Sequence, residues 1–344
     1  MAVQREQPLE GCHTLGRRMA AAAMRREGVG YSAARHRRGA ANVSIGIPVF
    51  NGERHIRRAL DSLLGQSYEE FELIISDNAS TDSTWQILED YAAKDGRITI
   101  HRQPQNIGAS SNFRFVLEGA SGVYFMWAAH DDWWSPGFIA AMVAELETHP
   151  DAAVCMSGVE RIRDGGESID IVRYSGKRDP NVMTSPQLAL RLAAGKPYHL
   201  YIYGLYRREF LLRAFQGFPR VAGGDRLFVC GVALATRFRY VDQVLYFRQM
   251  SQMTIARRYA DEELGRLWKD PFAGLKLVLL AGPYLLRMNL IPLRRKVWVP
   301  LIVLRLARWR AVRSLRQRAG DVLRKAGLHL AAEKILRRMS RRPG

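Results

Sequence analysis

At 344 residues the chain is long enough for one large or two ordinary domains with a buried core, and its formal net charge of +19 is unevenly placed. Residues 1–40 carry +5 and residues 271–344 carry +16, which leaves residues 41–270 close to neutral at −2. A nucleic-acid enzyme usually spreads positive charge over the face that reads its substrate. This distribution therefore argues against nucleic-acid binding and favours contact of the basic ends with an anionic membrane surface.

The cysteines and the apolar runs narrow the class of protein further. Cys12, Cys155 and Cys230 are far apart and lack CxxC spacing, which argues against a disulfide scaffold or a zinc cluster and favours a reducing compartment. Residues 1–40 are predicted to form a flexible basic extension, because their apolar run is too short for a secretory signal. Residues 275–293 are apolar but interrupted by charges and a proline, so no membrane-spanning helix is predicted.

Between residues 43 and 138 the sequence alternates predicted strands and helices. Strands are predicted at Val43–Val49, Phe71–Ile75, Arg97–His101 and Val123–Trp127, and helices at Glu53–Gln66, from Ser80 or Thr81 onward, and at Ala109–Glu118. The strands begin about 25–30 residues apart, the length of a βαβ unit with a right-handed crossover. The pattern predicts an α/β fold, a mostly parallel sheet with helices on both faces.

In such sheets ligands bind beyond the carboxyl ends of the strands. The loops that follow the four predicted strands are all rich in polar and small residues: Phe50–Glu53, Asp77–Ser80, Gln105–Gly108 and His130–Asp132. The last of these delivers two adjacent carboxylates to the sheet edge, where hard divalent cations could bridge them to phosphate oxygens. The sequence therefore indicates an enzyme that uses a nucleotide-activated substrate.

Beyond residue 150 the pattern is less regular. A strand is predicted at Ala152–Arg163, a hairpin turn at residues 164–167, and a helix at Leu227–Leu234 after Gly223-Gly224-Asp225. Residues 261–344 are predicted to form a basic, apolar-rich helical region associated with a membrane. The predicted organisation is thus an extension at 1–40, a catalytic domain at 41–260 and this basic region.

These residues resemble the family 2 glycosyltransferases, which have the GT-A fold. Val43–Glu53 is similar to the family's first strand and uridine-contacting loop, Asp77–Asp82 to its second-strand motif, and Asn106–Gly108 to a third element. His130-Asp131-Asp132 lies where the family places its metal-binding DxD. The resemblance covers residues 43–140 and, more loosely, 141–255. It implies a nucleotide-sugar donor, Mg²⁺ or Mn²⁺ as cofactor, and transfer with inversion at the anomeric carbon.

The resemblance also implies roles for individual residues of the donor site. Phe50 would lie against the base, and Asp77 would accept a hydrogen bond from the N3–H of uracil. The donor-binding set comprises Pro48, Phe50, Glu53, Asp77, Asn106 and Asp131, with Asp131 and Asp132 as metal ligands. The first DxD aspartate aligns with Ala129, and Asp132 could compensate for that missing carboxylate. His130 is either a further ligand or a hydrogen-bonding bystander.

Inversion requires a base that takes the proton from the acceptor hydroxyl, and the resemblance implies a carboxylate placed well after the DxD. Asp225 is the best match, and its flanking glycines would let an acceptor approach closely. The alternative is that Asp225 caps the helix that follows. Trp133 and Trp134 could either stack on a sugar ring or pack against the next helix.

The resulting interpretation is an inverting glycosyltransferase, cytoplasmic and peripheral on the inner face of the cell membrane. It would move one sugar from a UDP- or dTDP-sugar to a glycan or lipid-linked acceptor in surface polysaccharide or cell-wall synthesis. The QxxRW signature of processive synthases is missing, which favours one sugar per encounter. The alternatives are a non-catalytic nucleotide-sugar-binding module, a nucleotidyltransferase, and nucleic-acid binding through the Arg-rich tail.

Overall fold

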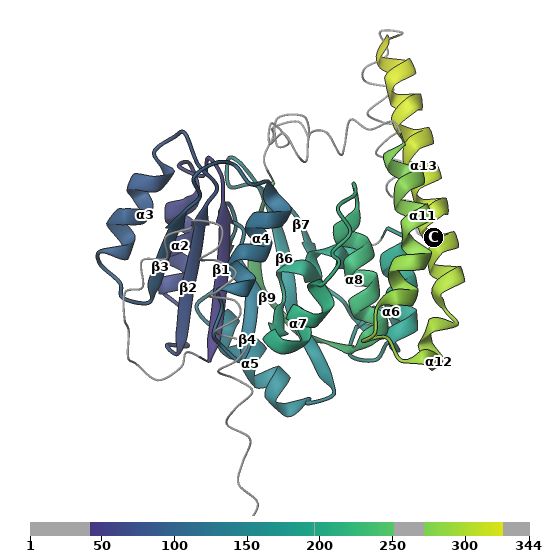
Figure 1. The fold of residues 1–344 in the computed structure, drawn as a ribbon, viewed down its shortest axis with the longest axis horizontal. Helices are drawn as coiled ribbons and strands as arrows, with labels where there is room; N and C mark the ends of the chain where they lie inside the picture. Colours follow the sequence, from purple (N-terminus) through teal and green to yellow (C-terminus); the bar gives the residue numbers. More distant parts are fainter. Residues whose placement is uncertain (1–41, 196, 251–271, 326–344) are drawn as a thin grey trace, which may run out of the picture. The chain divides into compact units, whose positions relative to one another are not determined.

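The computed structural model describes residues 42–195, 197–250 and 272–325, so the predicted extension at 1–40 and the predicted boundary near residue 260 lie outside the described residues. One nine-stranded sheet organises the fold (Figure 1), with the strand order β3-β2-β1-β4-β8-β6-β9-β5 and β7 paired to β6. Helices pack against this sheet, and three further helices follow it at the C-terminal end. The prediction of a mostly parallel α/β fold with a helical C-terminal region is confirmed.

The first half of the sheet is parallel and buried. β1 (Val43–Val49) pairs with β2 (Phe71–Asp77) on one side and β4 (Tyr124–Trp127) on the other, and β3 (Ile98–Arg102) pairs with β2. Parallel strands that are covered on both faces consist almost entirely of apolar residues. The sequences of β1, β2 and β4 show this pattern.

The second half is mixed. β6 (Ala152–Arg163) and β9 (Arg237–Met250) form a long parallel pair, and β8 (Leu205–Arg207) lies antiparallel between β4 and β6. β5 (Trp133–Trp134) pairs with β9, and β7 (Ser168–Val172) forms a hairpin with β6. β6 ends where the sequence predicts, because the turn that contains Gly166, at a φ of 83°, reverses the chain.

Helices connect the parallel strands. They are α2 (Ile56–Leu64), α3 (Thr84–Ala92), α4 (Ala109–Glu118) and α5 (Phe138–Thr148). The chain moves from β1 to β2 to β3 in one direction and then returns to β4 on the other side of β1. Because the crossovers are right-handed, this reversal places α4 on the opposite face from α2, and Figure 1 shows α4 in front of the strands and α2 behind them.

Two of these helices begin later than predicted. The expected helix at Glu53–Gln66 runs from Ile56 to Leu64, because residues 53–55 form a turn in which the His55 N–H donates to the Gly52 carbonyl at 3.0 Å. The helix expected from Ser80 or Thr81 starts at Thr84, and neither residue caps it. The Asp82 carboxylate accepts the hydrogen bond from the Thr84 N–H at 3.0 Å instead.

The remaining helices build a second layer beside β6 and β9. They are α6 (Ser185–Ala193), α7 (Arg208–Phe215), α8 (Gly224–Ala235), α11 (Ala273–Arg287), α12 (Leu293–Lys296) and α13 (Val299–Lys325), with 3₁₀ turns at Gly176–Arg178 and Pro197–Tyr203. α11 and α13 lie side by side (Figure 1), with α13 against α6 and α11 against α8. In the part of the chain that the structure describes, no helix has the length and apolar character needed to cross a bilayer.

Trp309 of α13 packs against the first turn of α8 and the residues that follow α6. The Arg226 guanidinium lies 4.5 Å from the centre of the Trp309 ring and donates a hydrogen bond to the Leu192 carbonyl at 2.6 Å. Trp309 also lies directly on the backbone of Gly195, where an added Cβ would be 2.3 Å from the indole. α13 is therefore packed against the ends of both α6 and α8 that lie near Asp225.

Candidate active site

The strand order reverses between β1 and β4, and in open α/β sheets ligands bind beyond the carboxyl ends of the strands at such a point. Hydrogen bonds join the loop after β1 to the loop after β2. The Asn51 N–H donates to Ser80 Oγ at 2.9 Å, and Asn51 Oδ1 accepts from the Thr81 N–H at 2.9 Å. The Gly52 N–H donates to Thr84 Oγ1 at 2.8 Å. The two loops therefore form one rigid rim.

The loop after β3 extends this rim through a pair of amides. Asn106 Oδ1 accepts from Asn78 Nδ2 at 2.8 Å and from the Gly108 N–H at 2.8 Å. Asn78 Oδ1 accepts from the Ile107 N–H at 2.9 Å. The predicted donor residue Asn106 is thus brought to the rim, and its carbonyl oxygen already fixes the loop.

Asp77 carries a polar atom that the fold leaves without a hydrogen bond. Its side chain is fully buried at the end of β2, and Oδ1 accepts from the Ser80 N–H at 3.1 Å. Oδ2 has no hydrogen-bond partner among the described residues, and Arg102 Nε lies 3.5 Å from it. Buried polar atoms in folded proteins nearly always have a partner. An acceptor oxygen without one, beside the switch point, is what a ligand N–H would complete.

Pro48, Phe50 and Glu53 lie on the same rim. Pro48 pairs with Ser76 of β2 beyond the last residue of β1 that pairs with β4, so its missing N–H breaks no ladder bond there. Phe50 is half-buried. Glu53 is exposed, and its Oε2 accepts from the Ser83 N–H at 3.0 Å, so this carboxylate stabilises the start of α3.

The loop after β4 closes onto the loop after β1 through a glycine. An added Cβ on Gly52 would lie 2.9 Å from Cδ2 of the His130 ring and 2.7 Å from Val49. The His130 ring therefore packs on the backbone of Gly52, which favours the bystander alternative for this histidine. Asp131 follows it and is half-buried, and its backbone carbonyl accepts from Arg58 Nη2 at 3.2 Å.

Asp132 differs sharply from its neighbour because it is buried. Oδ1 accepts from the Gln249 N–H at 2.9 Å, and Oδ2 accepts from the Tyr246 hydroxyl. Burial, together with the charge of Asp131, raises the pKa of Asp132 to about 7, against the opposing effect of Arg248. Both oxygens are thus engaged by β9, which leaves Asp131 as the more accessible carboxylate of the pair.

A polar network beneath these aspartates includes residues that the sequence did not single out. Arg58 of α2 donates to Gln249 Oε1 at 2.7 Å and lies 3.6 Å from the centre of the Trp133 ring. Gln249 Nε2 donates to Asp164 at 2.9 Å. The hydrogen bond between Arg58 and Gln249 joins residues 191 positions apart, and no local pattern marks such a pair.

The two tryptophans after the acidic pair are largely accounted for by packing. Trp134 is buried and stacks on Tyr246, and Trp133 is half-buried and stacks on Phe247. Trp134 also contacts Phe138 of the next helix, α5, with the ring centres 6.5 Å apart, which favours the packing alternative, although its indole N–H has no hydrogen-bond partner among the described residues. Trp133 lies between Arg58 and Phe247 and is partly exposed to solvent, so stacking on a sugar ring stays a prediction for this residue.

Asp225 lies in the first turn of α8 and is exposed. No side chain caps this helix by a hydrogen bond, so the capping alternative is not what the structure shows. Burial raises the pKa of Tyr203, and the charges of Asp132, Asp131 and Asp225 add to the effect while Arg248 opposes it. The charges of all three carboxylates thus act on the pKa of the same tyrosine.

The glycines before Asp225 have a local structural cause. Gly223 has a φ of 87°, a conformation that favours glycine, and an added Cβ on Gly224 would lie 2.0 Å from the Pro219 carbonyl oxygen. These two backbone requirements account for Gly223 and Gly224 without the predicted approach of an acceptor. We expect Gly224→Ala to lower the free energy of unfolding by about 1–3 kcal/mol, because backbone must move to accept the methyl group.

Thermal unfolding of Gly224→Ala checks this expectation. The matched control is Gly137→Ala at the start of α5, where an added Cβ meets nothing within 4 Å. We expect that control to stay within about 0.5 kcal/mol of the parent protein. Equal melting temperatures for the two variants would contradict the close contact with Pro219.

The side chains available as metal ligands fit a cation that is bound partly by the protein and partly by a substrate. Within residues 42–195, 197–250 and 272–325 there is no cluster of three or more His, Cys, Asp or Glu side chains that could hold a metal ion. Mg²⁺ is commonly bound through one or two carboxylates plus substrate phosphates, which is compatible with the half-buried Asp131.

Comparison with known proteins bears directly on this site. The family described as "Glycosyl transferase family 2" matches residues 44–213, which include the whole rim and the acidic pair. These residues form a family 2 glycosyltransferase domain. The rim at the switch point between β1 and β4 lies within the residues that match the family.

Relatives share this domain over part of their length. The uncharacterized protein Mb1547 of Mycobacterium bovis is 38% identical over 138 residues, which cover 39% of this chain and 40% of that protein. The uncharacterized glycosyltransferase RT0329 of Rickettsia typhi is 36% identical over 141 residues, 40% of this chain and 43% of that protein. The matched segment therefore spans about two fifths of these curated relatives.

Among solved structures, S. aureus TarS 1–349 in complex with UDP-GlcNAc superposes with a TM-score of 0.50 at 18% identity, covering 80% of this chain and 92% of that one. At this level of identity the similarity concerns the fold alone. It supports a GT-A-like fold for this chain.

Proposed function

We propose that this protein is an inverting glycosyltransferase that transfers one sugar from a nucleoside-diphosphate sugar, with UDP or dTDP as the favoured nucleotide, to a glycan or lipid-linked acceptor. The observation that carries the proposal is Asp77, a fully buried carboxylate with one oxygen lacking a hydrogen bond, beside the switch point of a family 2 glycosyltransferase domain. That oxygen would accept the N3–H of uracil or thymine. The fold neighbour TarS 1–349, which was crystallised with UDP-GlcNAc, is compatible with such a donor.

The residues of the site divide the work of donor binding. Phe50 lies against the base, while Pro48, Glu53 and Asn106 keep the rim in place around it. Asp131 would hold a divalent cation, Mg²⁺ or Mn²⁺, on the diphosphate, and the adjacent Asp132 is itself held by Tyr246 and Gln249. When bound, that cation offsets the charge of the departing nucleoside diphosphate.

Asp225 is the residue that we propose as the catalytic base. Its carboxylate takes the proton from the acceptor hydroxyl as the hydroxyl oxygen forms the new bond to the anomeric carbon, and the bond to the nucleoside diphosphate breaks on the opposite side of the ring. The exposed position of Asp225 leaves it open to an acceptor, and its charge, like the charges of the acidic pair, raises the pKa of Tyr203.

A second candidate function is a nucleotide-sugar-binding module without transferase activity. The observation that favours it is the acidic pair itself, in which Asp132 has both oxygens engaged and Ala129 stands at the first DxD position. Such a protein would bind the donor and leave it intact.

Nucleotide binding is testable by thermal shift with UDP, dTDP, GDP, CDP and ADP, each with and without Mn²⁺. We expect UDP or dTDP with Mn²⁺ to stabilise the fold by about 2.7 kcal/mol at 100 times the dissociation constant. The shift should disappear in Asp131→Ala and persist in Asp242→Ala, which removes an exposed carboxylate paired with Arg173. If no nucleotide shifts the parent protein, the donor site proposed here is wrong.

We further propose that the protein works at the cytoplasmic face of the cell membrane, in surface polysaccharide or cell-wall synthesis, with its C-terminal region on anionic lipid. Residues 272–312 contain eight Lys or Arg and no Asp or Glu. Large apolar side chains on the same segment are exposed, among them Leu279, Leu293 and Leu304. A surface that is both cationic and apolar suits the interface of an anionic bilayer.

A further inference from the structure

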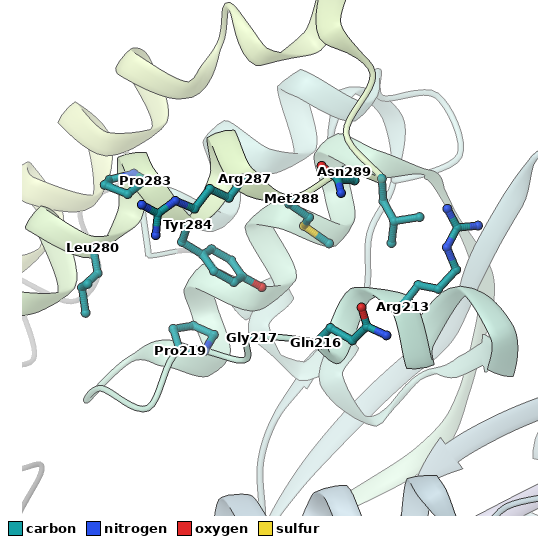
Figure 2. Close-up of a pocket in the computed structure, with 11 residues that line it drawn as sticks. Arg213, Gln216, Gly217, Pro219, Leu280, Pro283, Tyr284, Arg287, Met288 and Asn289 are labelled. Carbon is teal, nitrogen blue, oxygen red and sulfur yellow. The ribbon is translucent and has the colours of Figure 1, made fainter. Parts of the chain in front are cut away.

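A pocket of about 450 Å³ lies between the end of α7, the loop that follows it, and the last turns of α11 (Figure 2), well within the size of small-molecule sites. Its polar lining includes Arg213, Gln216, Tyr284 and Arg287, and its apolar lining includes Leu280 and Pro283. No carboxylate lines it. Figure 2 shows Arg213 and Arg287 on opposite sides of the pocket with their guanidinium groups directed away from each other, and Gln216 and Tyr284 between them.

The two arginines are available to a ligand. Both are exposed, and neither forms a side-chain hydrogen bond or an ion pair with another described residue. Each lies in the last turn of its helix, where the helix dipole favours a cation. That dipole is equivalent to only about half a charge per helix, so the full charges of the guanidinium groups leave the pocket positive. The hydroxyl of Tyr284 is buried without a hydrogen-bond partner in the described ranges.

The apolar wall of the pocket continues onto the outer surface of α11. Leu280 is 45% exposed, and its neighbours on the helix, Leu279 and Leu286, are 64% and 51% exposed. A free sugar phosphate would gain nothing from these side chains, whereas an amphiphile would cover them. A second copy of the chain is a poor occupant, because the eight cations of residues 272–312, with no anion among them, would repel their counterparts.

We propose that this pocket binds the phosphate headgroup of an anionic phospholipid, with the acyl chains along the exposed leucines of α11. The exposed side chains of Arg213 and Arg287 would turn toward the headgroup in the pocket and donate charge-assisted hydrogen bonds to it. This inference rests on the membrane association proposed above and adds a defined headgroup site to it. It also brings Arg213, at the edge of the glycosyltransferase domain, into contact with the membrane.

The test is co-sedimentation with vesicles of phosphatidylcholine alone and of phosphatidylcholine with phosphatidylglycerol. The variant Arg213→Gln/Arg287→Gln removes the pocket arginines, and Arg294→Gln/Arg308→Gln removes two exposed arginines that do not line it. Both lose the same charge. We expect the pocket variant to bind phosphatidylglycerol vesicles about tenfold more weakly than the control variant, because headgroup hydrogen bonds are lost in addition to general attraction.

Each other outcome overturns the headgroup site in a distinguishable way. Equal loss in the two variants would mean that surface charge alone attracts the membrane, which would leave the association itself intact. Binding that does not depend on phosphatidylglycerol would exclude the anionic headgroup. If free glycerol phosphate displaces the protein from the phosphatidylglycerol vesicles, the pocket binds a soluble phosphate. If the parent protein self-associates and the pocket variant does not, the pocket binds a second copy of the chain. Thermal unfolding of both variants verifies their folding, and nucleotide binding is measured separately on each.

Discussion

Asp225→Asn is expected to abolish sugar transfer while leaving both the fold and donor binding intact. Removal of a general base typically lowers the rate by about 10²–10⁴-fold. The asparagine keeps the shape of the side chain, and Asp225 is exposed in a helix without a side-chain cap, so only the interaction with the helix dipole is lost, about 0.3–1 kcal/mol. Transfer is measured as release of nucleoside diphosphate, with the donor that the thermal-shift panel selects and extracted glycolipid as acceptor.

The control for this experiment lies on the neighbouring helix. Glu209 is likewise an exposed carboxylate in a first turn, that of α7, so Glu209→Gln loses the same helix-dipole interaction without touching the proposed base. We expect this variant to retain full turnover. Near-normal turnover of Asp225→Asn would refute the assignment of the base. Donor binding without turnover in the parent protein would favour the non-catalytic alternative.

Asp77→Asn is expected to change which base the site accepts. The asparagine can still accept the Ser80 N–H through its carbonyl oxygen, but it places an NH₂ group where Oδ2 now lies. Uracil and thymine present N3–H there and would lose a hydrogen bond to a charged group, worth about 1.5–3 kcal/mol or roughly 10- to 150-fold in the dissociation constant. Cytosine has an acceptor at N3, so CDP should bind the variant better than it binds the parent protein.

The measurement is the dissociation constant of UDP and CDP for the parent protein and for Asp77→Asn. A purely structural role for Asp77, held by Arg102 3.5 Å away, would weaken both nucleotides alike. Arg102→Gln serves as the control, because it removes the ion pair and leaves the acceptor oxygen in place. Loss of UDP binding in Arg102→Gln as severe as in Asp77→Asn, with no gain for CDP, would contradict base recognition by Asp77.

The parts of the fold that the sequence predicted to the residue are those with strong local signals. α4 and β6 have the predicted bounds because each combines a regular apolar pattern with a glycine-containing loop or turn at one end. The starts of α2 and α3 were misplaced, because they depend on hydrogen bonds between two loops about 30 residues apart, such as that from Gly52 to Thr84. Contacts of that kind leave no periodic trace in the sequence.

By itself, the sequence determined the α/β class, the order of the parallel strands along the chain, and the residues that follow each strand, because strand spacing and motifs are local properties. Only the tertiary structure decided what those residues do. Asp131 and Asp132 are adjacent in the chain, yet Tyr246 and Gln249, more than a hundred residues later, bury one and leave the other accessible. Likewise, the exposure of Asp225 and the Asp77 oxygen without a hydrogen bond arise from packing, since burial and hydrogen bonding depend on the neighbours that the fold brings together.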